Sequence, residues 1–111
     1  MYTTLLKAFY YEENLLSLEE TVSQNIRLKL KNKHGVNISE VEECFSNREL
    51  TFLEDKREEH KTTPATQWFI AETDYGRKLK VVFIDFPDRI ELKTAYEPYE
   101  EELRIYMKFA K

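Results

Sequence analysis

Residues 67–85 read QWFIAETDYGRKLKVVFID, two apolar stretches separated by a short polar one. Gln67–Thr73 and Lys78–Asp85 both have the length and the aromatic and β-branched content that are typical of strands, and the second is the most apolar stretch of the chain. Gly76 lies between them and suits the positive φ that a tight turn requires. This stretch predicts an antiparallel hairpin whose second strand is central in a sheet.

The segments on either side of this hairpin predict one further strand each. Leu50–Leu53 is a short apolar stretch, and a long polar loop, Glu54–Thr66, separates it from the hairpin. Loops of this length are often functional. Arg89–Tyr96 alternates in polarity, as expected of a strand with two different faces. One face carries Ile90, Leu92, Thr94 and Tyr96, and the other carries Arg89, Glu91, Lys93 and Ala95.

A helix is predicted near the start of the chain. Ser17-Leu18-Glu19-Glu20 has the pattern of a capping box, with Ser as the N-cap and Glu three residues later. Gly35 suits the end of that helix. The alternation of residues 26–31 also fits a strand, but the cap, the spacing and the stop all favour a helix. Its apolar positions follow at a spacing of four and are Leu18, Val22, Ile26 and Leu30.

Two more helices are predicted, one before the sheet and one after it. A second capping box, Ser39–Glu42, opens a short helix that ends near Asn47 and turns Val41, Cys44 and Phe45 inward. Pro98 suits the first position of a C-terminal helix. Because helices and strands form separate runs, we expect an α+β fold with two N-terminal helices and an antiparallel sheet of about four strands. The C-terminal helix has an apolar stripe that is expected in the core: Tyr99, Leu103, Tyr106, Met107 and Ala110.

The composition suits a single domain that spans residues 1–111. Hydrophobic residues make up 41% and charged residues 34%, which provides enough apolar surface for one core. No apolar run is long enough to cross a bilayer, the N-terminal residues lack the pattern of a signal peptide, and Cys44 has no second cysteine to pair with. We therefore expect a cytoplasmic protein with no membrane partner. Two histidines and one cysteine without close pairing predict no metal and no cofactor.

The charge of the chain is acidic but uneven. The formal net charge is −4, which argues against broad nucleic-acid binding, because phosphate binding depends on positive charge. The run from Arg27 to Lys33 has four basic residues and no acidic one and is typical of a solvated helix face, with a phosphate-binding track as the alternative. His34 directly precedes Gly35 and fits a helix end, where a positive charge is favourable against the helix dipole.

Several short motifs occur in a defined order along the chain. They are Lys33-His34-Gly35-Val36, Ser39-Glu40-Val41 and Phe45; Asp55 and His60 in the loop; Phe69, Gly76-Arg77, Leu79 and Val81–Phe83 in the hairpin; and Glu102 with Arg104–Tyr106. Their order resembles that of BrnT-type toxins over about residues 22–106. The resemblance implies a RelE-like fold, ribonuclease activity and a neutralising antitoxin as partner. The chain has Thr94-Ala95-Tyr96 where these toxins tend to carry Ser-Ala-Arg.

Cleavage of RNA without a metal needs a general base for the 2′-hydroxyl proton, a cation for the phosphorane charge and an acid for the leaving oxygen. His60 is a candidate acid or base, because the ordinary histidine pKa lies near neutrality. Arg77 and Lys80 are candidates for phosphate stabilisation, and Tyr96 for proton donation. The candidate catalytic residues are thus His60, Arg77, Lys80 and Tyr96, and the candidate substrate-binding residues are Trp68, Lys93, Tyr99 and Arg104.

These candidates also have ordinary structural interpretations. His60 lies among charged residues and fits a solvated loop, and Arg77 fits an exposed turn. Lys80 and Lys93 fit the wet face of a sheet. Trp68 fits either the core or an anchor for a partner.

Two functions follow from these alternatives. The first is an RNA-cleaving toxin, in which basic residues of the sheet and loop converge with His60 in a concave site. The second is a non-catalytic protein-interaction module, either an immunity-type protein or a degenerate toxin relative, which the acidic balance and the 14% aromatic content favour. In that case the charges scatter, and an exposed patch around Trp68 or the tyrosines is expected. The expected partners are RNA and an antitoxin in the first case, and a cognate toxin in the second.

Overall fold

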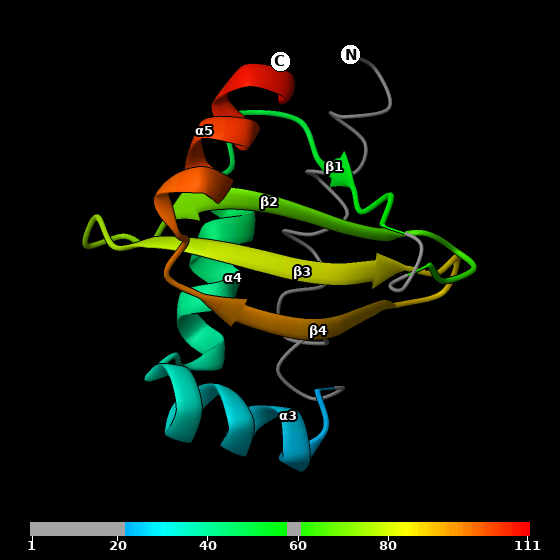
Figure 1. Ribbon diagram of the computed structural model, residues 1–111. Coiled ribbons are helices and arrows are strands. Elements are labelled where there is room, and N and C mark those ends of the chain that lie inside the picture. Colours follow the sequence, from blue (N-terminus) through cyan, green and yellow to red (C-terminus); the bar gives the residue numbers. More distant parts are fainter. Residues whose placement is uncertain (1–21, 58–60) are drawn as a thin grey trace.

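The computed structural model describes residues 22–57 and 61–111. Four strands form one antiparallel sheet in chain order, β1-β2-β3-β4, and helices lie on both of its faces, with α4 behind and α5 in front (Figure 1). The α+β class, the antiparallel sheet and the C-terminal helix are thereby confirmed. The elements are α3 (Gln24–Lys29), the π-helix η1 (Leu30–His34), α4 (Ile38–Asn47), β1 (Leu53–Glu54), β2 (Thr66–Glu72), β3 (Lys78–Asp85), β4 (Ile90–Tyr96) and α5 (Glu100–Phe109).

The β2–β3 hairpin agrees closely with the prediction. β3 has the predicted bounds, and β2 begins and ends one residue earlier than Gln67–Thr73. Gly76 in the turn has φ 84°, a value that residues with a side chain rarely adopt. The apolar, aromatic and β-branched content of the strands and the glycine of the turn were therefore sufficient to locate the centre of the sheet.

The first helix of the described chain begins later than predicted. Ser23 is the extended N-cap of α3, and its hydroxyl accepts a hydrogen bond from the backbone N–H of Ile26. Because an extended residue cannot lie inside a helix, the prediction of one uninterrupted helix from Ser17 to the stop at Gly35 is wrong at this point. Ser17 itself lies outside the described residues. The predicted stop is confirmed, since η1 ends at His34 and Gly35 follows as its C-cap with φ 63°.

The start of α4 is displaced by two residues from the prediction. Asn37 is the N-cap, and its backbone N–H donates to the Glu40 side chain, 3.0 Å away. The predicted cap, Ser39, lies inside the helix. The end at Asn47 is confirmed. The predicted inward face is also confirmed, because its members Val41, Cys44 and Phe45 are buried.

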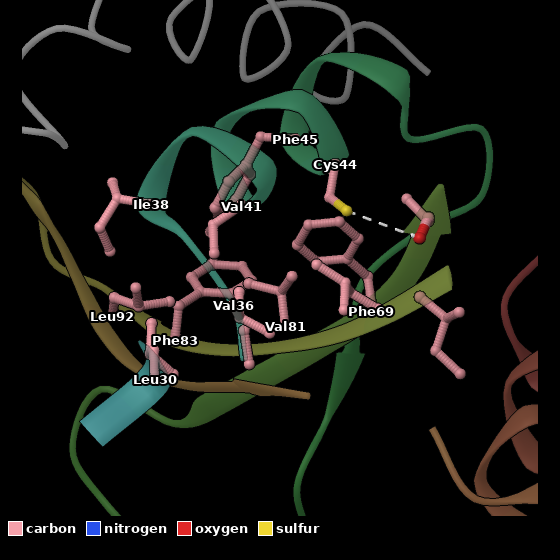
Figure 2. Close-up of a cluster of buried hydrophobic side chains, with 14 of the residues drawn as sticks. Leu30, Val36, Ile38, Val41, Cys44, Phe45, Phe69, Val81, Phe83 and Leu92 are labelled. Carbon is pink, nitrogen blue, oxygen red and sulfur yellow. Dashed lines mark hydrogen bonds between the residues drawn. The ribbon is translucent and has the colours of Figure 1, made fainter. Parts of the chain in front are cut away.

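A cluster of aromatic rings between α4 and the sheet forms the centre of the core (Figure 2). The Phe45 ring centroid lies 4.9 Å from that of Phe69 and 5.3 Å from that of Phe83. Burial of each such ring stabilises the fold by roughly 1.5–3 kcal/mol. Beside them the Cys44 thiol is 3.6 Å from the backbone oxygen of Ala71. The odd-numbered residues of β2 and β3 thus face α4.

A β-bulge in β4 changes which residues share a face. The pairing with β3 skips Lys93, which remains as an extra residue on the bulged strand. As a result Leu92 and Ala95 are both buried against the core, although they are three positions apart. The predicted alternation is therefore wrong across the bulge, because Leu92 does not share a face with Thr94 and Tyr96.

The strand before the loop is shorter and later than predicted. β1 covers Leu53–Glu54, whereas the sequence predicted Leu50–Leu53. The reason is that the segment before Leu53 leaves the edge of β2. The carbonyl oxygen of Thr51 accepts a hydrogen bond from the Tyr106 hydroxyl of α5, at 2.9 Å, in place of a ladder partner.

The predicted apolar stripe of α5 is only partly buried. Tyr106 and Ala110 are in the core, and Leu103 packs against it. Tyr99 and Met107 are instead 71% and 59% exposed, so their placement in the core is wrong. The cause is that α5 covers one end of the sheet face rather than its whole length (Figure 1). No helix within residues 22–57 or 61–111 is long and apolar enough to span a membrane.

Candidate functional site

The sheet face opposite α4, which we call the open face, brings together several of the predicted site residues. Lys80 of β3 is paired with Tyr96 of β4, and the even-numbered positions of β2 and β3 share this face. Trp68 of β2 lies there too, with its ring 5.6 Å from that of Tyr106 in α5. We define the Lys80 cluster as Trp68, Lys80, Tyr96, Tyr99 and Glu102.

Glu102 is the centre of this cluster. One carboxylate oxygen accepts hydrogen bonds from the Lys80 ammonium and from the Tyr96 hydroxyl, each at 2.7 Å. The other oxygen accepts from the backbone N–H of Tyr99, at 2.9 Å, which satisfies a free donor at the start of α5. The helix start therefore fixes the carboxylate, and the carboxylate in turn fixes a side chain from each of two strands.

The Lys80 ammonium is enclosed by aromatic rings as well as by the carboxylate. Its nitrogen lies 4.5 Å from the centroid of the Trp68 ring and 5.7 Å from that of Tyr96. Cations in such positions are attracted to the ring faces. Lys80 is only 8% exposed, so the predicted wet position on the sheet is wrong for this residue.

The protonation states in the cluster follow from its burial and its partners. Burial raises the pKa of Glu102, but hydrogen bonds from Lys80 and Tyr96 outweigh it and hold the pKa below its ordinary value. Burial first, and then the hydrogen bond to Glu102, raise the pKa of Tyr96, whereas the charge of Arg57 acts in the opposite direction. At neutral pH the carboxylate is therefore charged, and the phenol keeps its proton.

A histidine that the sequence placed at a helix end lies beside the cluster. The His34 ring centroid is 5.4 Å from that of Tyr96, because η1 packs against β4. Burial lowers the pKa of His34, and the charges of Lys33 and Lys29 lower it further. The imidazole is therefore neutral at neutral pH, and the expected favourable charge against the helix dipole is absent there. A neutral imidazole can accept a proton.

Arg77 is not part of the cluster. Its guanidinium donates to the backbone oxygens of Gly35 and His34, at 2.9 and 3.3 Å, and to the carboxylates of Glu40 and Glu97. Burial lowers the pKa of Arg77, but the bonds to these carboxylates outweigh it and leave the pKa raised. Arg77 thus joins the end of η1, the start of α4 and the segment after β4, which is a structural role.

The remaining predicted site residues lie elsewhere or outside the described chain. Lys93 is exposed and lies 3.7 Å from the carboxylate of Glu91. Arg104 is exposed and forms an ion pair with Glu101 on the same helix. His60 lies outside the described residues. The structure therefore gathers Trp68, Lys80, Tyr96 and Tyr99, and it does not gather Arg77, Lys93 or Arg104.

Glu102 in the cluster and His34 beside it were not among the candidate site residues. Glu102 occurs three residues after Tyr99, a capping spacing that would have placed its carboxylate at the helix start. His34 approaches Tyr96 only through the packing of η1 on β4, and no local pattern indicates that contact.

The chain matches no protein-family model, no curated protein and no solved structure. The resemblance to BrnT-type toxins and the RelE-like fold therefore stay predictions. In the described ranges, no group of three or more histidine, cysteine or acidic side chains is arranged to hold a metal ion.

Proposed function

We propose that the chain is a small endoribonuclease of the toxin type, and that the Lys80 cluster together with His34 is its active site. The observation that carries this proposal is the juxtaposition of a neutral imidazole, an ammonium and a protonated phenol. These groups come from His34, Lys80 and Tyr96, and they meet at one end of the open face. They are the three kinds of group that RNA cleavage by transesterification requires.

Each group has a defined task in the proposed reaction. The His34 imidazole takes the proton of the ribose 2′-hydroxyl, whose oxygen then forms a bond to phosphorus. The Lys80 ammonium stabilises the negative charge of the phosphorane. The bond from phosphorus to the 5′-oxygen breaks, and Tyr96 gives its proton to that oxygen. The products are a 2′,3′-cyclic phosphate and a 5′-hydroxyl, and the imidazolium proton then returns to the phenolate.

Two further residues that the structure describes support the proposal. Glu102 positions both Lys80 and Tyr96, and an entering phosphate oxygen would compete with its carboxylate for the ammonium. Tyr99 is 71% exposed beside Tyr96, with 6.0 Å between their ring centroids, and offers a surface on which a base can stack. We expect His60 to supply a second proton donor from the loop.

The proposal is tested by expressing the chain in a sensitive bacterial host and incubating the purified protein with total RNA. We expect growth arrest and RNA with 2′,3′-cyclic ends. Tyr96→Phe and His34→Asn should each lower the cleavage rate roughly 100-fold, the usual size of a proton-transfer contribution. Tyr75→Phe, which changes a tyrosine that is 95% exposed, is the matched control and should cleave normally. If the wild-type protein is folded and well expressed but growth is normal and the RNA stays intact, the proposal is overturned.

A second candidate function, a non-catalytic protein-interaction module, is favoured by a specific observation. The four cations expected to bind phosphate, Arg77, Lys80, Lys93 and Arg104, are each paired with a carboxylate. Such pairing leaves little net positive charge for RNA, in keeping with the net charge of −4. Intact RNA in the experiment above would support this second function.

A further inference from the structure

A groove runs along the outer edge of β2, on the part of that edge that β1 does not pair with. Its volume is about 920 Å³, near the upper end of the roughly 300–1,000 Å³ that is usual for ligand-binding pockets. The pairing of β1 with β2 ends at Leu53 and Trp68, so Ile70 and Glu72 lie beyond it on the outer edge of the sheet. Figure 1 shows β1 as a short strand beside only one part of β2. We call this the edge groove.

The register shows which backbone groups point into the edge groove. The Thr66 carbonyl accepts a hydrogen bond from Asp55 on the β1 side, so the even-numbered residues of β2 direct their backbone groups to that side. The carbonyl of Glu72 is bound by the Asn47 amide, 3.0 Å away. Within residues 22–57 and 61–111, no hydrogen-bond partner is found for the Ile70 carbonyl or the Glu72 N–H. The Ile70 N–H faces the Tyr106 hydroxyl. The Ile70 carbonyl and the Glu72 N–H are thus one acceptor and one donor open to a partner strand.

The walls of the groove are apolar, and its rim is acidic. Leu103, Tyr106 and Met107 of α5 form one wall, and Leu50 lies on the other side. Met107 is 59% exposed, so part of this apolar wall is open to solvent. The charged residues that line the groove are Glu49, Glu72, Asp74 and Lys78, which is three negative charges against one positive, a net of −2.

We propose that the edge groove binds an extended basic segment of a partner protein, which adds a strand to the outer edge of β2. The backbone of the segment bonds to the Ile70 carbonyl and the Glu72 N–H, and apolar side chains at alternate positions pack against Leu103 and Met107. Lysine or arginine side chains between them face the acidic rim. This binding does not depend on ribonuclease activity, because no residue of the groove belongs to the proposed active site.

The test uses the isotopically labelled full chain and short synthetic peptides in which lysine alternates with valine. We expect the amide resonances of residues 70–73 to shift on titration. A peptide in which glutamate replaces lysine should not bind, and one with proline at the central positions should bind much more weakly, because proline cannot donate to the Ile70 carbonyl. Equal binding of the lysine and glutamate peptides, or shifts that avoid residues 70–73, would overturn the proposal.

Two double variants with the same change in net charge distinguish binding to the acidic rim of the groove from attraction of the basic peptide to the protein's overall negative charge. Glu49→Lys with Glu72→Lys should weaken binding of the lysine peptide roughly tenfold. Asp88→Lys with Glu91→Lys changes the net charge equally at the opposite end of the sheet and should leave binding unchanged. Two other occupants would also overturn the proposal. If a second copy of the chain occupied the groove, the amide resonances of residues 70–73 would shift with protein concentration alone. If a segment of the same chain occupied it, no peptide would shift the resonances of the wild type.

Discussion

Cys44 shows how strongly its surroundings control a single side chain. Its thiol is fully buried, and burial, followed by the negative charges of Glu43 and Glu40, raises its pKa to about 12. We predict that iodoacetamide leaves Cys44 unmodified in the folded protein at about pH 8 and modifies it once denaturant is added, because only the thiolate is nucleophilic. Mass spectrometry measures the modified fraction. Equal labelling rates for folded and denatured protein would contradict the burial described above.

Arg77 joins three segments, and we predict that its contribution is to stability. Arg77→Met should lower the free energy of unfolding by roughly 2 kcal/mol, because the Glu40 carboxylate loses its cation and two backbone oxygens lose a charged donor. Urea denaturation followed by circular dichroism measures this difference. Arg104→Met, which removes an exposed ion pair within α5, is the control and should leave stability unchanged. If the free energy of unfolding of Arg77→Met equalled that of the wild type, the predicted contribution of Arg77 to stability would be wrong.

At the scale of elements, α5 is held to the sheet by Glu102, and this attachment depends on pH. The folded-state pKa of Glu102 lies below its ordinary value, so the stability it contributes is present above about pH 4.3, the unfolded value, and is lost as pH falls through the folded one. We predict that Glu102→Gln is less stable than wild type at neutral pH and that the gap narrows in acid. Urea denaturation over this pH range measures it.

Glu100→Gln is the matched control for this prediction, because Glu100 is exposed at the start of the same helix. The stability of Glu100→Gln should differ little from that of the wild type over the whole pH range. A Glu102→Gln difference that stays constant from neutral to acid pH would contradict the described role of the carboxylate.

Some elements could be predicted from the local sequence and others could not, and the reasons are physical. The β2–β3 hairpin was predictable because the aromatic and β-branched content of its strands and the glycine of its turn, Gly76, are both visible within a few residues. The bulge at Lys93 was not, because an extra residue in a strand has no characteristic side chain. Asn37 and Ser39 are both good N-caps, and the burial of Ile38 at the start of α4 accompanies the choice of Asn37.

At the scale of the whole molecule, the sequence indicated which kinds of side chain the candidate site contains. It did not indicate which of the candidate residues come together in the fold. Lys80 and Tyr96 were chosen for their chemistry, and their meeting depends on a register that the bulge sets. Arg77 lies outside the Lys80 cluster because it forms ion pairs with Glu40 and Glu97, which are far away in the sequence. Contacts of this kind form only when the elements pack, so no pattern within one segment predicts them.

The strand order also determines when the site forms during synthesis. Each strand pairs with the strand that precedes it in the chain, so the sheet can grow one strand at a time as the polypeptide emerges from the ribosome. Glu102 lies on α5, which follows all four strands. Lys80 and Tyr96 therefore acquire their shared partner only after all four strands have been synthesised, and a nascent chain that ends before α5 carries an unassembled cluster.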